Sequence, residues 1–83
     1  MEGELTFARM DELVARADQL AAADSIDLAR VRRIDSAGAA FLLELSRRAA
    51  ESGRTLHFVN AGQQVLGLLQ FLQIDGVLRL AKS

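Results

Sequence analysis

The 83-residue sequence contains no cysteine, proline, tryptophan or tyrosine, and its one histidine is His57. Without cysteine the chain cannot form disulfides, bind metal through thiolates or use a cysteine nucleophile. A single histidine also gives no support to a histidine-rich metal site or a Ser-His-Asp triad. We therefore expect no metal, no cofactor and no catalytic residue, and we predict that the chain is not an enzyme.

The sequence also lacks a large excess of charge of either sign, and it has no long apolar run. Ten basic and eleven acidic residues give a net charge of −1, so no overall basic field attracts nucleic acid or an anionic membrane. No run reaches the ~18 apolar residues of a membrane span, and Met1 is followed by Glu2 and Glu4 instead of a basic leader region. We expect a cytoplasmic protein that neither inserts into the membrane nor binds nucleic acid.

The apolar pattern predicts one α/β domain over residues 1–83. Strands are expected at residues 3–6, 25–28, 55–59 and 77–80, and helices at 7–22, 37–52 and 61–72, with a basic connection at 29–34. This alternation predicts a small, mixed but mostly parallel sheet of about four strands, with three helices packed against it.

Local signals set the expected helix boundaries. Thr6 is placed to cap the first helix, whose apolar stripe is Leu13, Val14, Ala17, Leu20 and Ala21. Gly53 is expected to end the second helix, and Asn60 is placed to cap the third. Asp75 and Gly76 predict a turn.

The stretch Asp35-Ser36-Ala37-Gly38 is the most site-like part of the chain. It follows the basic residues Arg32 and Arg33 and opens the second helix, where unpaired backbone N–H groups favour a negative charge. Two interpretations stay open from the residues alone. Ser36 could simply cap the helix, with Gly38 a packing site. Alternatively, Ser36 is a contact or phosphorylation site, with bare small residues around it and an arginine beside it.

Other candidates are weaker. Asp27 and Asp35 could form a carboxylate pair, but no nucleophile or metal set accompanies them, and His57 is expected on the polar side of its strand. The third predicted helix is leucine-rich over most of its circumference. Leu68 and Phe71 are therefore either core residues or part of a self-association surface.

Read together, these segments resemble the STAS domain family, which includes anti-sigma-factor antagonists and the tails of sulfate transporters. The resemblance covers nearly the whole chain, and its most specific part is a strand and loop followed by Asp-Ser-Ala-Gly and a helix. The matching segments are Gly3-Glu4-Leu5-Thr6-Phe7, Ile26-Asp27-Leu28, Val31, Ile34-Asp35-Ser36-Ala37-Gly38, Phe41-Leu42-Leu43-Glu44-Leu45, Gly53-Arg54 and Leu56-His57-Phe58-Val59-Asn60.

Two branches of the family imply different partners. The single hydroxyl in Asp-Ser-Ala-Gly and the leucine-rich last helix look most like the MlaB branch. That resemblance implies a non-catalytic subunit that binds the cytoplasmic ATPase of an ABC transporter of phospholipids and so lies at the inner membrane. In the other branch, the anti-sigma-factor antagonists, Ser36 would be phosphorylated by an anti-sigma kinase. Both branches place Ser36 at the partner interface, surrounded by Asp35, Ala37, Gly38 and Arg33.

One departure from the family pattern concerns the first strand. STAS domains usually begin with a further strand before the Gly-Glu-Leu segment, whereas Met1 lies only two residues upstream of it here. Lack of that strand would expose a sheet edge, which favours strand exchange or a homodimer in isolation.

Overall fold

Strands and helices alternate along the chain, which confirms the predicted α/β class. The computed structural model describes residues 1–80. In order, the elements are β1 (Glu2–Leu5), the 3₁₀ turn η1 (Phe7–Arg9), α1 (Met10–Ala15), α2 (Ala17–Ala21), β2 (Ser25–Asp27), β3 (Arg30–Ile34), α3 (Ser36–Glu51), β4 (His57–Val59) and α4 (Gln63–Phe71).

The four strands form two separate pairs instead of the single sheet that we predicted. β1 pairs with β3 and β2 pairs with β4, both in parallel. The chain turns between β2 and β3, where the Asp27 carboxylate accepts the N–H of Ala29 at 2.8 Å and the Leu28 carbonyl accepts the N–H of Val31 at 3.1 Å. This turn sends the two consecutive strands to different partners.

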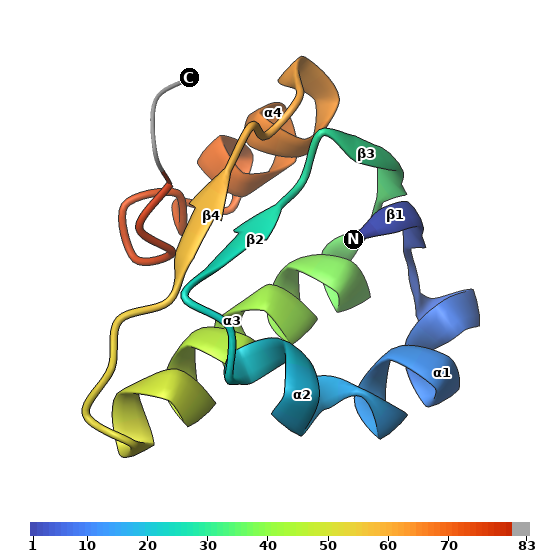
Figure 1. Ribbon diagram of the computed structural model, residues 1–83. Coiled ribbons are helices and arrows are strands. Elements are labelled where there is room, and N and C mark those ends of the chain that lie inside the picture. The colour runs from blue at the N-terminus through green and yellow to red at the C-terminus, as the bar shows by residue number, and fades with distance from the viewer. Residues whose placement is uncertain (81–83) are drawn as a thin grey trace.

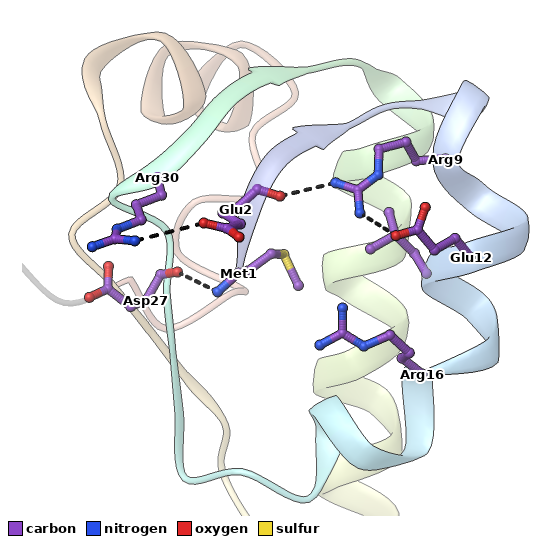
Figure 2. Close-up of a pocket in the computed structure, with 8 residues that line it drawn as sticks. Met1, Glu2, Arg9, Glu12, Arg16, Asp27 and Arg30 are labelled. Atoms are coloured by element: carbon purple, nitrogen blue, oxygen red, sulfur yellow. Dashed lines mark hydrogen bonds and ion pairs between the residues drawn. The ribbon is translucent and has the colours of Figure 1, made fainter.

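β3 corrects our prediction of a basic connection at residues 29–34. Val31 is buried, whereas the three arginines of the strand are exposed. Along the β1–β3 register, Arg30 lies 3.8 Å from Glu2 and Arg33 lies 4.0 Å from Glu4. Figure 2 marks the ion pair between Arg30 and Glu2. The register skips Arg32, which forms a bulge. The sequence pattern did not indicate this strand, because the arginines of β3 form ion pairs with glutamates of β1, which lie far away in the sequence.

The helices lie on both sides of the strands (Figure 1). α1, α2 and α3 occupy one side and α4 the other, where it contacts β3. None of the helices within residues 1–80 is long and apolar enough to cross a membrane.

The predicted first helix is interrupted. Residues 7–9 form the 3₁₀ turn η1, and Arg16 has non-helical dihedral angles that separate α1 from α2. Leu13 and Ala17 of the predicted apolar stripe are buried, whereas Val14 is 54% exposed. Thr6 does not cap the helix as predicted, since its hydroxyl donates to the Glu4 carboxylate at 3.3 Å.

The helix α3 is the central element of the core, and it ends where the sequence predicted. Phe41, Leu42 and Leu45 are buried on its inner face. Gly53 follows the helix with φ +73°, and its N–H donates to the Ala50 carbonyl at 2.9 Å. These features form the left-handed glycine cap that Gly53 was expected to provide.

The N-terminal turn of α3 lies directly against β1. A Cβ built on Gly38 would stand 1.9 Å from the backbone oxygen of Leu5 and 2.8 Å from its Cβ. No side chain fits at this position. Gly38 therefore allows a close approach of two backbones within the chain and is itself buried.

The C-terminal segment departs from two predictions. Asn60 has φ +60° and donates to the Asp27 carboxylate at 3.4 Å, so it does not cap α4, whose N-cap is Gly62. Residues 77–80 form a turn and a single parallel bridge between Phe58 and Leu80 instead of a strand. Leu78 is nevertheless fully buried in the core.

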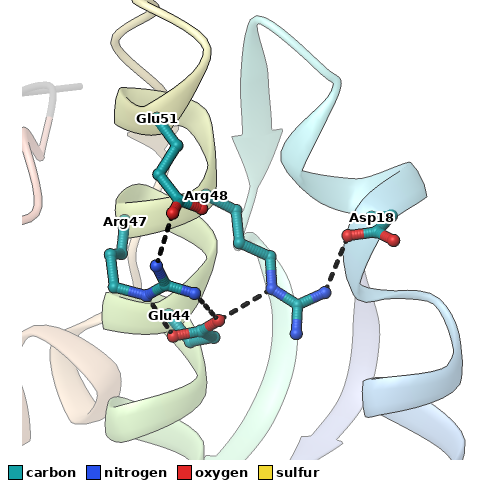
Figure 3. A network of polar contacts seen from close by, with 5 residues as sticks. All are labelled: Asp18, Glu44, Arg47, Arg48 and Glu51. Carbon is teal, nitrogen blue, oxygen red and sulfur yellow. Dashed lines mark hydrogen bonds and ion pairs between the residues drawn. The ribbon is translucent and has the colours of Figure 1, made fainter.

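An ion-pair network joins α2 to α3 (Figure 3). Arg48 contacts Asp18 of α2 at 2.8 Å and Glu44 at 2.7 Å, and Arg47 contacts Glu44 at 2.6 Å and Glu51 at 3.1 Å. Hydrogen bonds, first from Arg47 and then from Arg48, lower the pKa of the Glu44 carboxyl from its ordinary 4.5 to about 2. Glu44 is therefore the acceptor shared by both arginines.

Gly38→Ala should destabilise the fold by about 3 kcal/mol, because the added methyl collides with the backbone of Leu5. Gly67→Ala is the matched control. A Cβ at Gly67 meets nothing within 4 Å, and alanine in a helix should add about 1 kcal/mol of stability. Urea unfolding followed by circular dichroism measures both changes. Equal midpoints for the two variants would contradict the packing of α3 on β1.

Glu44→Gln should lower stability near neutral pH, and the difference from the original protein should shrink in acid. Because the folded-state pKa of Glu44 is lowered, its stabilising effect is complete above about pH 4.5 and is lost as the pH falls toward about 2. Thermal unfolding at a series of pH values measures this difference. Raising the salt to about 0.5 M should also reduce it, since exposed ion pairs are screened. A difference that is constant between pH 7 and pH 2.5 would exclude a role for the Glu44 charge.

Candidate functional site

Asp35 organises the start of α3. One oxygen of its carboxylate accepts the backbone N–H of Gly38 at 3.0 Å, which is the bond of a helix N-cap. The other oxygen accepts the backbone N–H of Phe7 at 3.0 Å. These bonds, first that from Phe7 and then that from Gly38, lower the pKa of the Asp35 carboxyl. A single side chain thus caps α3 and fixes η1 beside it.

Ser36 is the first residue of α3 and is exposed. The helix cap is Asp35, so the interpretation of Ser36 as a helix cap is wrong. Within residues 1–80 its hydroxyl makes no hydrogen bond to another side chain or to the backbone. Ala37 is half-buried and Ala40, one turn further along, is exposed. The surface of this first turn therefore consists of a hydroxyl and small side chains.

The residues that we grouped around Ser36 differ in accessibility. Asp35 is half-buried by its two hydrogen bonds, and Gly38 lies beneath Leu5, so the packing interpretation applies to Gly38. Arg33 is exposed, with its guanidinium 4.0 Å from Glu4. Surface contact with a partner is thus open to Ser36, Ala37 and Arg33, whereas Asp35 and Gly38 hold them in place.

Phe7 is exposed next to the start of α3, and the sequence did not single it out. It is 77% exposed, and its backbone is held to the Asp35 carboxylate at the start of α3. The sequence predicted a helix that begins at Phe7 and gave no expectation for the exposure of this residue. The only available signal was its position outside the apolar stripe of that helix.

The two residues proposed for self-association lie at the far end of α4. Leu68 is half-buried, and Phe71 is 82% exposed. Leu72 and Val77 are also exposed there. Exposure of Phe71 agrees with one of the two alternatives for this helix, and its part in self-association remains a prediction.

The weaker candidates do not converge on a reactive centre. His57 is exposed on β4, and Asp27 is engaged with the N–H of Ala29 in the turn after β2. Asp35 is occupied by backbone N–H groups at the start of α3. Within residues 1–80 no three acidic or histidine side chains are grouped so that they could hold a metal ion.

Comparison with known families agrees with this architecture. The family model described as "Mlab, STAS domain" matches residues 1–80. The chain belongs to this STAS domain family. Comparison with curated proteins finds no match. In this STAS domain, the Asp-Ser-Ala-Gly segment at residues 35–38 lies at the start of α3, and its serine is on the surface.

Asp35→Ala should lower the thermal unfolding midpoint by several degrees, because it removes the acceptor of both the Gly38 and the Phe7 N–H groups. Ser36→Ala is the matched control and should change the midpoint little, since the Ser36 side chain is exposed. Circular dichroism gives the midpoints, and amide exchange of Gly38 reports the cap directly. A larger loss in Ser36→Ala than in Asp35→Ala would overturn the assignment of the cap.

Proposed function

We propose that this STAS domain is the non-catalytic subunit of an ABC-type phospholipid transporter and that it binds the cytoplasmic ATPase of that transporter. In this role it supports the assembly or activity of the ATPase at the inner membrane and so contributes to outer-membrane lipid asymmetry. It neither hydrolyses ATP nor carries lipid. The match to the MlaB-type STAS family supports the branch, and the exposed surface at the start of α3 supplies the contact.

The observation that carries this proposal is the exposure of Ser36 and of Phe7, whose backbone N–H donates to the Asp35 carboxylate at the start of α3. Small side chains at Ser36, Ala37 and Ala40 let another chain approach the helix closely. The exposed ring of Phe7 offers an apolar anchor of the kind that dominates binding at protein interfaces. Because both Phe7 and α3 are attached to Asp35, little order has to be gained on binding.

A second function, that of an anti-sigma-factor antagonist, is favoured by the exposure of the Ser36 hydroxyl to a kinase. A phosphate on Ser36 would lie next to the Asp35 carboxylate, which already occupies the Gly38 N–H. Phosphorylation would therefore add like charge to this surface, and Arg33 is the nearby cation on β3. Such a modification would act by repelling a partner or attracting a different one.

A pull-down from the native host with the tagged chain distinguishes these functions. Recovery of an ABC ATPase together with its membrane permease is the expected result. Recovery of an anti-sigma kinase, with one phosphate added to the chain in intact-mass spectrometry and lost in Ser36→Ala, would support the second function instead.

Two substitutions on the proposed surface should each weaken ATPase binding roughly tenfold or more in calorimetry. Ser36→Glu places a larger, charged group among small side chains, and Phe7→Ala removes the apolar anchor. The matched control is Phe71→Ala, which removes an equally exposed ring from α4 and should leave the affinity unchanged. If Phe71→Ala weakens binding and Phe7→Ala does not, the partner binds at α4 and this surface is wrong.

A further inference from the structure

The segment that follows α4 turns back toward β4 and contains the pair Asp75-Gly76 (Figure 1). Within this segment the N–H of Leu78 donates to the Ile74 carbonyl at 3.0 Å. A bond between residues four apart closes a single turn that does not continue into a helix. The peptide bond between Asp75 and Gly76 therefore lies inside a hydrogen-bonded ring over residues 74–78.

The Asp75 carboxylate and the Gly76 N–H are both unoccupied in the part of the chain that the structure describes. The aspartates with side-chain hydrogen bonds or ion pairs there are Asp18, Asp27 and Asp35, and Asp75 is not among them. No carbonyl within residues 1–80 accepts the N–H of Gly76, which is exposed. Neither group is therefore held by the fold.

The lack of a side chain at Gly76 leaves room for these two groups to meet. A Cβ built on Gly76 would meet nothing within 4 Å, so the backbone here is open to solvent. Glycine also has the widest choice of backbone angles, which lets its nitrogen approach the side chain of the preceding residue. The carboxyl carbon of Asp75 is separated from that nitrogen by only the Cα, Cβ and carbonyl carbon of Asp75, so a bond between them closes a succinimide ring.

We infer that Asp75-Gly76 is a site of spontaneous isoaspartate formation. The Gly76 nitrogen attacks the Asp75 Cγ, a C–N bond forms, and the proton of the nitrogen leaves with the carboxyl hydroxyl as water. Water then adds back to the succinimide. Opening at Cγ restores aspartate, and opening at the α-carbonyl gives isoaspartate, whose main chain runs through Cβ and Cγ. The inference is independent of the proposed function.

Isoaspartate would change the packing of Leu78. Its additional main-chain carbon enters the ring closed by the bond from Leu78 to Ile74. Leu78 is fully buried, and the N–H of Phe58 donates to the Arg79 carbonyl at 3.3 Å directly after it. Because a close-packed core does not absorb such a shift, the longer main chain displaces Leu78 from its site.

Incubation of the full chain at neutral pH, folded and in guanidinium chloride, tests the site. Peptide mapping with electron-transfer fragmentation measures isoaspartate at each aspartate. The folded rate at Asp75 should be within about threefold of the unfolded rate, because exposed turns open at almost no cost in free energy. Asp35-Ser36 is the internal control. Its carboxylate accepts two N–H groups, so its rate should fall at least about tenfold on folding. A fall of that size at Asp75 would overturn the inference.

Gly76→Ala is the matched variant for the chemistry. It should slow isoaspartate formation at Asp75 severalfold, since the methyl group restricts the approach of the nitrogen. The fold should be retained, because the new Cβ meets no other atom within 4 Å. An unchanged rate in the folded variant would contradict the role assigned to Gly76.

The isoaspartyl form, separated by chromatography, tests the effect on Leu78. Its thermal unfolding midpoint should be several degrees lower than that of the original protein. The N–H of Leu78 should also exchange at least about tenfold faster, because its bond to Ile74 is lost. An unchanged midpoint together with unchanged exchange at Leu78 would show that the turn accepts the longer main chain, and would overturn the displacement of Leu78.

Discussion

The N-terminal turn of α3 lies so close to the end of β1 that Gly38 has no room for a side chain beside Leu5, and the arrangement of the rest of the molecule follows from this contact. It brings the Asp35 carboxylate within 3.0 Å of the Phe7 N–H, so that the segment leaving β1 is fixed to the helix start. It also sets the orientation from which α3 buries Phe41, Leu42 and Leu45. Packing and surface are therefore determined by the same few atoms.

The same contact separates residues that hold the surface from residues that form it. Asp35 and Gly38 face inward and are used by the fold, whereas Ser36 and Phe7 face outward. In the segment Asp35-Ser36-Ala37-Gly38, Asp35 and Gly38 therefore support the fold, and Ser36 presents an exposed hydroxyl. The hydrogen bonds that support this segment do not involve the Ser36 side chain.

Arginines have unrelated roles in this small domain. Arg48 joins α2 to α3, while Arg54 donates to the carbonyls of Ala22 and Ala23 at the end of α2. Arg9 instead covers backbone carbonyls of β1. The guanidinium suits all of these positions because it carries several donors in a fixed plane and stays charged. The nearly balanced charge of the sequence gives no indication of these roles, because each arginine contacts either a residue distant in sequence or a backbone carbonyl.

The sequence by itself determined the α/β class, the position of α3 and its glycine cap at Gly53. These features depend on local signals, namely apolar periodicity and residues with special backbone preferences. Only the tertiary structure decided that residues 30–34 form a strand, that the sheet divides into two pairs, and that Asp35 caps the helix in place of Ser36. It alone also placed the Phe7 N–H on the Asp35 carboxylate and Arg9 on backbone carbonyls of β1. Each of these depends on contacts between residues far apart in the chain or between a side chain and the backbone, which periodicity does not encode.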